Sequence, residues 1–361
     1  MLFEPDRIYI DESVIDSHFT RNILAKFPNA EQIFLNPSNK EQPYQDVTLS
    51  TGKKYLYLKA YQGAPIKLCP GFSKDLLCCN YYVIDLVENC PLECTYCILQ
   101  AFLNRPIIVL HINVEDIIDR LKTEIDSSPE QIFRIGTGEH SDSLAMDHIF
   151  NINPYLVERF AQFKNAYLEL KTKTDMIEPL KGLNHGGKTI IGWSLNPPEI
   201  IKSQEFKTAD LDQRLKAASN MADEGYKIAF HFDPIIYYPD WKSGYKQTIE
   251  AMFDAVESKQ IAWISLGTLR YIPSLKKIAE ERFPNISIFS NEFIPAADGK
   301  MRYLKIIRQE LIQQMSNWIS VLSPKTPLYI CMEKQSIWNK TMPLVPTSPE
   351  ALDIYLQSNL K

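Results

Sequence analysis

Residues 90–97 read Cys90-Pro91-Leu92-Glu93-Cys94-Thr95-Tyr96-Cys97, and they place three thiols at C-x3-C-x2-C spacing directly after an apolar run, Tyr81–Val87. A zinc finger or ribbon takes four ligands, usually as two separated pairs, whereas the one later cysteine in this chain is Cys331. Three close thiolates instead suit a [4Fe-4S] cluster whose fourth iron has no protein ligand and can be chelated by a small molecule. The alternatives are a structural metal site or three buried core cysteines.

The spacing C-x3-C-x-aromatic-C after a first strand resembles the signature of the radical S-adenosylmethionine (radical SAM) enzymes. The resemblance implies that Cys90, Cys94 and Cys97 ligate a [4Fe-4S] cluster. In that family the open iron binds the amino and carboxylate groups of S-adenosylmethionine. The reduced cluster then cleaves this cofactor to methionine and a 5′-deoxyadenosyl radical, and Tyr96 is expected to lie beside the adenine.

Composition sets further limits on the class of protein. The chain has 361 residues, 45% of them hydrophobic and 23% charged, which is ordinary for a globular protein. No run of eighteen apolar residues and no signal peptide are present, so we expect no membrane association. The clustered cysteines indicate a reducing compartment and predict a cytoplasmic protein. The net charge of −5 means that any nucleic-acid binding has to come from a local basic patch.

Strand-like and helix-like runs alternate from Tyr81 onward, which predicts an α/β fold with a parallel sheet and crossover helices. Six such units fit a partial (β/α)6 TIM-type barrel, with catalytic groups at the carboxyl ends of the strands. We expect an N-terminal extension over 1–80, the barrel over 81–300 and a C-terminal extension over 301–361. The expected strands are Tyr82–Val87, Gln131–Ile135, Ala166–Leu170, Thr189–Leu195, Lys227–Phe232 and Ile261–Leu266, and the expected helices include Val114–Ile125, Leu211–Glu224 and Tyr245–Glu257.

Polar residues follow several of these strands. Gly136-Thr137-Gly138-Glu139 follows the second, where glycines let the backbone approach a ligand and Glu139 offers an acceptor for a cation. The segment resembles the radical SAM motif that holds the amino group of S-adenosylmethionine; the alternative is a plain strand-to-helix turn. Lys171 and Lys173 close the third strand, where a lysine inside a barrel mouth can pair with a carboxylate. At an exposed strand end it is only a solvated charge, and this second interpretation is favoured. His231, in the fifth strand, is read equally well as a site residue or as a core histidine.

A closer resemblance is to the spore photoproduct lyase family, and it covers about residues 80–310. The similar segments are Arg134–His148, Leu170–Lys173, Ser194, Gly225–Trp241 and Arg270–Pro284. The family repairs 5-thyminyl-5,6-dihydrothymine in DNA: a hydrogen atom is abstracted from C6, the methylene bridge breaks, and a hydrogen is returned. The resemblance implies that Ser141, Lys173 and Ser194 contact S-adenosylmethionine, that DNA with an ultraviolet-induced thymine dimer is the partner, and that a flavodoxin or ferredoxin supplies electrons.

The chain departs from the well-studied lyases at two linked positions. Glu139 stands where they carry the cysteine that returns the hydrogen, and Ile98 stands where they carry a tyrosine coupled to that step. A carboxylate cannot replace a thiol here, because its O–H bond is much stronger than S–H. The chain therefore resembles a divergent subgroup, for which Cys69, Cys78 and Cys79 are candidate alternative donors. Their other interpretation is as small buried apolar residues.

Basic residues near the C-terminus are candidates for DNA contact. If Lys300–Arg308 is helical, Arg302 and Lys305 lie on one basic face, and Arg270 ends a strand nearby. The alternative is a solvated helix face. Two other functions stay open: a radical SAM enzyme acting on a different nucleic-acid or nucleoside substrate, and an iron–sulfur protein that binds nucleic acid or senses redox state. Cleavage of S-adenosylmethionine separates these two classes.

Overall fold

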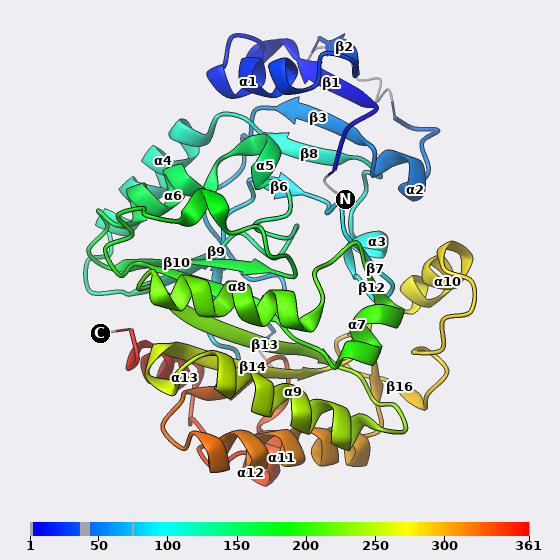
Figure 1. Cartoon of the computed structure of the whole chain (residues 1–361), viewed down its shortest axis with the longest axis vertical. Coiled ribbons are helices and arrows are strands. Elements are labelled where there is room, and N and C mark those ends of the chain that lie inside the picture. Colours follow the sequence, from blue (N-terminus) through cyan, green and yellow to red (C-terminus); the bar gives the residue numbers. More distant parts are fainter. Residues whose placement is uncertain (1–2, 37–43, 74–75, 361) are drawn as a thin grey trace.

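An eight-stranded sheet runs through the centre of the protein in the computed structural model, which describes residues 3–36, 44–73 and 76–360 (Figure 1). Within this sheet every neighbouring pair is parallel except the pair of β5 with β4, the strand at one edge, which is antiparallel. In spatial order they are β18 (Leu328–Ile330), β14 (Ile261–Thr268), β13 (Lys227–Ile235), β11 (Thr189–Ser194), β10 (Ala166–Thr172), β9 (Phe133–Gly136), β5 (Tyr82–Val83) and β4 (Lys67–Leu68). The sheet is open, so the partial barrel is confirmed.

The central strands are nearly continuous apolar runs because both of their faces are covered. Every residue of β11 and β14 is buried, as is typical of parallel strands under crossover helices. The expected helices are present, and α8 packs against β11 and β13. Asp210 caps α8 in a capping box with Gln213. The larger crossover and covering helices are α4 (Val114–Asp126), α6 (Asn153–Phe160), α8 (Leu211–Asp223), α9 (Trp241–Ala255) and α11 (Lys305–Leu322).

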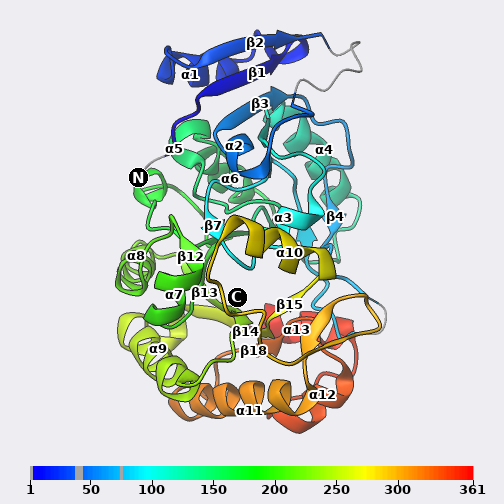
Figure 2. The ribbon, with the colours of Figure 1, turned by 90° about the vertical axis from the view of Figure 1, so that its right-hand side faces the viewer.

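A second sheet of five strands caps one end of the molecule (Figures 1 and 2). Three of its strands come from the predicted N-terminal extension, namely β1 (Arg7–Asp11), β2 (Glu31–Leu35) and β3 (Tyr55–Lys59). They continue onto β8 (Ile108–His111) and β6 (Val87–Glu88), which come from the predicted barrel segment. Backbone pairing therefore joins the two segments, and the division at residue 80 stays a prediction.

The C-terminal part of the chain corrects one expectation. Met301–Tyr303 form strand β17, which pairs with β15 (Arg270–Tyr271) and β16 (Phe293–Pro295), and helix α11 starts only at Lys305. A helical reading of residues 300–304 is therefore wrong, because their backbone groups bond across this small sheet. The expected final strand is confirmed as β18, which extends the central sheet. Over the described ranges no helix combines the length and apolarity needed to cross a membrane.

Candidate active site

A pocket of about 440 Å³ opens at the carboxyl ends of the central strands. Its lining comes from the cysteine segment, from the loop after β9, and from the ends of β10, β11, β13, β14 and β18. Ten residues singled out in the sequence line it: Cys90, Cys94, Tyr96, Cys97, Gly138, Glu139, Ser141, Lys173, Ser194 and Arg270. Six others do not: Cys69, Cys78, Cys79, Gly136, Arg302 and Lys305.

The three motif cysteines lie on one loop over the pocket. Asn89, with a left-handed φ of 68°, turns the chain, and its side-chain oxygen accepts the backbone N–H of Cys90 at 2.8 Å. Cys94 lies in β7 (Glu93–Cys94), which pairs with β12 (Glu205–Phe206). The backbone N–H of Cys97 donates to the carbonyl of Cys94 at 3.2 Å. The loop geometry is therefore fixed by backbone bonds that leave all three thiols at the pocket.

These thiols suit a multi-iron cluster better than a single ion. Burial raises the pKa of Cys90 to about 12 and that of Cys94 well above its ordinary value, so each becomes a thiolate only beside a strong cation. Throughout the described part of the chain, no three His, Cys, Asp or Glu side chains are placed to hold one metal ion. In a [4Fe-4S] cluster each thiolate binds a different iron, so three separated cysteines at one pocket fit that group.

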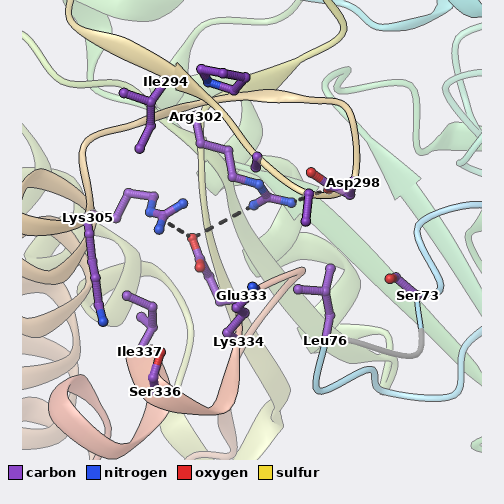
Figure 3. A pocket seen from close by; sticks show the side chains of 14 residues that line it. Ser73, Leu76, Ile294, Asp298, Arg302, Lys305, Glu333, Lys334, Ser336 and Ile337 are labelled. Atoms are coloured by element: carbon purple, nitrogen blue, oxygen red, sulfur yellow. Dashed lines mark hydrogen bonds and ion pairs between the residues drawn. The ribbon is translucent and has the colours of Figure 1, made fainter.

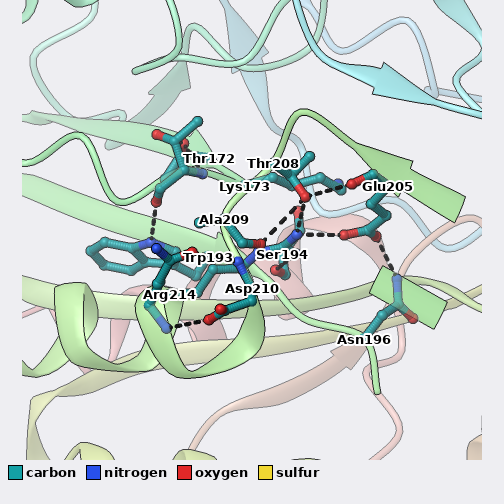
Figure 4. A network of polar contacts seen from close by, with 12 residues as sticks. Thr172, Lys173, Trp193, Ser194, Asn196, Glu205, Thr208, Ala209, Asp210 and Arg214 are labelled. Atoms are coloured by element: carbon teal, nitrogen blue, oxygen red, sulfur yellow. Dashed lines mark hydrogen bonds and ion pairs between the residues drawn. The ribbon is translucent and has the colours of Figure 1, made fainter. Parts of the chain in front are cut away.

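A buried ion pair holds the other side of this loop (Figure 4). The Tyr96 hydroxyl donates to Glu205, which also accepts from Asn196 at 2.8 Å and from Arg214 at 2.6 Å. Burial alone would raise the pKa of Glu205, but the positive charges of Arg214 and Lys173 lower it to about 2. Arg214 also donates to the Ser194 carbonyl at 2.9 Å. One carboxylate therefore ties the cysteine loop to the end of β11.

Sequence reasoning missed this pair, although one signal for it exists. Arg214 lies three residues after Leu211 on a face of α8 that also carries Leu215 and Ala218, and all four side chains are buried. A charge on an apolar helix face requires a buried partner. The partner, Glu205, lies nine residues earlier and outside the helix, so the pattern of α8 alone does not identify it.

In the predicted Gly-Thr-Gly-Glu segment, Gly136 packs behind the pocket, whereas Gly138 and Glu139 line it. An added side chain at Gly136 would overlap the hydroxyl of Tyr81, so this glycine serves packing behind the pocket. At Gly138, a Cβ would lie 2.8 Å from the Cβ of Lys171. Glu139 and Lys171 form an ion pair at 2.9 Å. Lys171 is mostly buried, and the nearby carboxylates outweigh burial and raise its pKa, so its interpretation as a solvated charge is wrong.

Asp142, also missed in the sequence, organises the predicted S-adenosylmethionine contacts. It accepts the Thr172 hydroxyl at 2.8 Å and the backbone N–H of Lys173 at 2.7 Å, so it joins the loop after β9 to the end of β10. The Lys173 ammonium lies 6.0 Å from the centre of the Tyr96 ring. Beside it the Ser141 hydroxyl is buried and has no hydrogen-bond partner within the described structure. An unpartnered buried hydroxyl at a pocket is free to bind a ligand.

The far wall of the pocket is built from paired charges. His231 in β13 contacts Glu169 at 2.8 Å and Ser265 at 2.7 Å. Although burial opposes it, His231 lowers the pKa of Glu169 to about 2. Asp233, two residues further, binds Arg270 through both carboxylate oxygens at 2.9 and 3.0 Å. His231 therefore lines the pocket with both ring nitrogens already partnered, which fits either interpretation, and Arg270 belongs to the pocket wall.

A second pair at the pocket mouth was also missed. His140 donates from Nδ1 to the Asp85 carboxylate at 2.6 Å, and its ring stacks on Phe102. The hydrogen bond to Asp85 raises the pKa of His140. Burial works against ionisation of Asp85, but His140 and Lys67 lower its pKa to about 2. The other ring nitrogen of His140 is buried, and the described residues offer it no partner.

The predicted DNA contacts of the C-terminal segment lie at a separate pocket of about 480 Å³ (Figure 3). Arg302 is 4% exposed and points toward Asp298 and Glu333, binding Asp298 at 2.5 Å. Its guanidinium is therefore engaged inside the protein. Lys305, the first residue of α11, and Lys334 are exposed at the rim.

The three cysteines predicted as alternative donors lie behind the main pocket. Cys69 accepts the backbone N–H of Gly71 at 3.4 Å, and burial raises its pKa to about 12. Cys78 and Cys79 are hydrogen-bonded to each other. None of the three lines the pocket.

An open parallel half-barrel with three loop cysteines and a polar pocket at its strand ends defines the radical SAM class. The family model described as spore photoproduct lyase matches residues 3–324. The chain belongs to the spore photoproduct lyase family and is therefore a radical SAM enzyme of the lyase type.

Curated relatives and solved structures agree with this family. Spore photoproduct lyase of Bacillus subtilis (strain 168) is 26% identical over 340 residues, covering 90% of this chain and 98% of that protein. The Clostridium acetobutylicum enzyme is 23% identical over 334 residues, with 89% and 97% covered. A variant spore photoproduct lyase with bound AdoMet and dinucleoside spore photoproduct has a TM-score of 0.79 at 22% identity, covering 91% of this chain and 99% of its own. At that identity the structural match shows the fold.

Replacing Arg214 with Met tests the buried pair. The change leaves Glu205 buried without its countercharge, which typically costs about 3–5 kcal/mol. Urea unfolding should show a loss of this size, and the double variant R214M/E205M should recover much of it. Lys122→Ala, which removes an exposed pair with Asp126, is the control and should cost at most ~0.5 kcal/mol. A loss below about 1 kcal/mol in R214M would contradict the account.

Stability near the pocket mouth should depend on pH through His140. The raised pKa of His140 gives stability that is full below its ordinary value of 6.5 and is lost as pH rises through the raised value. The lowered pKa of Asp85 gives stability present above 3.8 and lost as pH falls toward 2. His140→Gln should therefore lower Tm more at pH 5.5 than at pH 9, by on the order of 2 °C.

The control for this measurement is His18→Gln, because the His18 side chain is 55% exposed and its nearest carboxylate lies 3.8 Å away. Its Tm difference from the wild type should be small and flat with pH. An equal loss for H140Q at pH 5.5 and pH 9 would show that the Asp85 pair does not contribute through charge.

Proposed function

We propose that the protein is a spore photoproduct lyase that repairs the spore-type thymine dimer in DNA with a [4Fe-4S] cluster and S-adenosylmethionine. One observation carries the proposal: the three motif thiols face the same pocket as the polar groups at the ends of five parallel strands. The family membership supports it. The B. subtilis relative named for this activity is similar over 98% of its length.

The cofactors fit the side of the pocket near the cysteine loop. Cys90, Cys94 and Cys97 would hold the cluster. Glu139, with its carboxylate, would accept the amino group of S-adenosylmethionine, and Lys173 would face its carboxylate. The hydroxyls of Ser141 and Ser194 would bind polar groups, the backbone at Gly138 lets the ligand approach closely, and Tyr96 would flank the adenine. When bound, this pair of cofactors supplies a 5′-deoxyadenosyl radical.

The remaining wall suits a pyrimidine dimer. His231, the Asp233–Arg270 pair and Ser265 present donors and acceptors that match the carbonyl and N–H groups of two thymine rings. Because these groups are already paired with one another, they are held in place before the substrate arrives. Leu269 and Ile272 add apolar contacts that exclude water from the reacting carbons. The dimer would thus lie opposite the cofactor wall.

DNA outside the dimer would lie along the rim of the second pocket. Lys305 and Lys334 are exposed there, while Arg302, held by Asp298, shapes the rim from below. Arg270 would instead contact the flipped dimer inside the main pocket. Because the whole chain carries a net charge of −5, phosphate contacts would have to come from a local group of exposed basic residues such as these.

The cellular setting follows from the same chemistry. All seven cysteines lie in the described ranges and are free thiols, which suits a reducing cytoplasm. A low-potential one-electron protein such as a flavodoxin or ferredoxin would reduce the cluster.

Anaerobic turnover tests the proposed function. The protein is reconstituted with iron and sulfide, reduced with dithionite, and given S-adenosylmethionine with synthetic spore photoproduct dinucleotide. We expect release of thymidylyl-thymidine by chromatography. Cys94→Ala should lose at least 10²-fold of this activity because the cluster loses a ligand, while Lys259→Ala, far from the pocket, should retain it.

Formation of 5′-deoxyadenosine without dimer consumption would reject the substrate and keep the radical chemistry. If neither 5′-deoxyadenosine formation nor dimer consumption occurs in protein that carries about four irons per chain, the radical SAM enzyme class is rejected.

Salt dependence of DNA binding tests the phosphate contacts. Lys305→Ala and Lys334→Ala should each weaken binding to duplex DNA carrying the dimer, and each should reduce the slope of log K against log salt by about 1. Lys259→Ala is the matched control because this exposed lysine precedes β14 at the opposite end of the strands. If the slope of log K against log salt is unchanged for both variants, the DNA binds at another surface of the protein.

A further inference from the structure

Cys331 is a thiol of the main pocket that the cluster does not use. It follows β18, the last strand of the central sheet, and lies beyond the residues matched by the family model. Of the chain's seven cysteines, all within the described ranges, Cys331 alone lines the pocket outside the three-cysteine motif. Its backbone N–H donates to the carbonyl of Leu266 at 2.8 Å, which fixes it to β14.

The sulfur of Cys331 is held by two charged groups of the pocket wall. Arg270 lies 3.6 Å from it, and Arg270 is itself fixed by two hydrogen bonds to Asp233. Asp233 also accepts a hydrogen bond from the Cys331 thiol. Burial keeps the pKa of this thiol well above its ordinary value, so the S–H bond persists at neutral pH. The pocket therefore presents an oriented thiol rather than a thiolate.

The same pocket is built to take a ligand. The Ser141 hydroxyl is 4% exposed, lines the pocket and has no partner in the described structure. It lies on the cofactor side, whereas Cys331 lies with His231 and Asp233 on the other. A molecule filling the pocket between these two walls therefore meets the thiol on the side away from the cluster loop.

We propose that Cys331 is the catalytic hydrogen-atom donor that completes dimer cleavage in this protein. The assignment rests on the proposed function, because a lyase reaction that begins by taking a hydrogen atom must return one to give intact thymines. The S–H bond of Cys331 breaks homolytically, a C–H bond forms at the carbon radical of the product, and the sulfur becomes a thiyl radical. One electron from the protein's one-electron reductant and one proton from solvent restore the thiol.

The geometry favours Cys331 over the donors expected from the sequence. Cys69, Cys78 and Cys79 lie close enough to interact electrostatically with one another and with Cys331. None of the three lines the pocket, whereas Cys331 does, so Cys331 is the thiol placed to meet a substrate carbon there. Hydrogen transfer between two thiols breaks one S–H bond and forms another. These neighbouring thiols could therefore return a hydrogen atom to the thiyl radical of Cys331.

Turnover in D₂O distinguishes the donors. Thiol hydrogens exchange with solvent, so the wild type should place one deuterium in the thymidylyl-thymidine product, measured by mass spectrometry. In Cys331→Ala, dimer consumption should continue while intact deuterated product falls at least tenfold. Cys331→Ser should behave alike, because its O–H bond is too strong to donate. Deuterated product unchanged in both variants, or lost instead in C69A, C78A or C79A, overturns the assignment.

A second readout does not need turnover. Prolonged iodoacetamide labelling of the folded protein at alkaline pH, where a fraction of the Cys331 thiol ionises, should modify Cys331, as measured by peptide mass analysis. The dinucleotide dimer should slow that modification at least tenfold while leaving the labelling of Cys78 unchanged. Equal labelling of Cys331 with and without the dinucleotide overturns the placement. A wild type that never consumes the dimer rejects the proposed function itself, which distinguishes that failure from failure of the donor assignment.

Discussion

The ion pair between Arg214 and Glu205 is the constraint on which the site depends. Both side chains are fully buried, and the pair joins helix α8, strand β12, the carbonyl of Ser194 and, through Tyr96, the cysteine loop. The cysteine loop also buries Leu92, Tyr96 and Leu99, and the charge pair fixes its position relative to α8 and β11. The charge pair is directional, because hydrogen bonds of the guanidinium and the carboxylate reach the segment 205–209, the end of β11 and Tyr96.

The same principle arranges the rest of the pocket. Lys171 is paired with Glu139, His231 with Glu169, and Arg270 with Asp233. Charged groups that are paired before a ligand binds do not have to reorganise when it does. Against this fixed background a few groups stay available, among them the Ser141 hydroxyl and the thiol of Cys331. The parallel half-barrel brings them together because the ends of all its strands lie at one edge.

Sequence patterns predicted the parts of this structure that depend on local order. Five of the six expected strands, the helices between them, and the cysteine motif were visible as runs or spacings. The expected strand Tyr82–Val87 is instead divided between β5 in the central sheet and β6 in the five-stranded sheet.

Most of the missed contacts join residues far apart in the chain: Tyr96 and Glu205 are 109 residues apart, and Asp85 and His140 are 55 apart. Arg214 and Glu205 are nine residues apart but belong to different elements. Lys171 looked solvated because its partner, Glu139, lies in the loop after β9, more than thirty residues earlier. Residues 300–304 looked helical because Met301 and Leu304 continue the apolar spacing of α11, and pairing with other strands overrides that local pattern.

The most direct test of the whole account is a crystal structure of the anaerobically reconstituted protein with S-adenosylmethionine and the dinucleotide dimer. The account predicts a cluster on Cys90, Cys94 and Cys97, the cofactor against Ser141, Lys173 and Ser194, and the dimer between the cofactor and Cys331. Electron density for the dimer outside this pocket, for example over the surface of Figure 3, would contradict it.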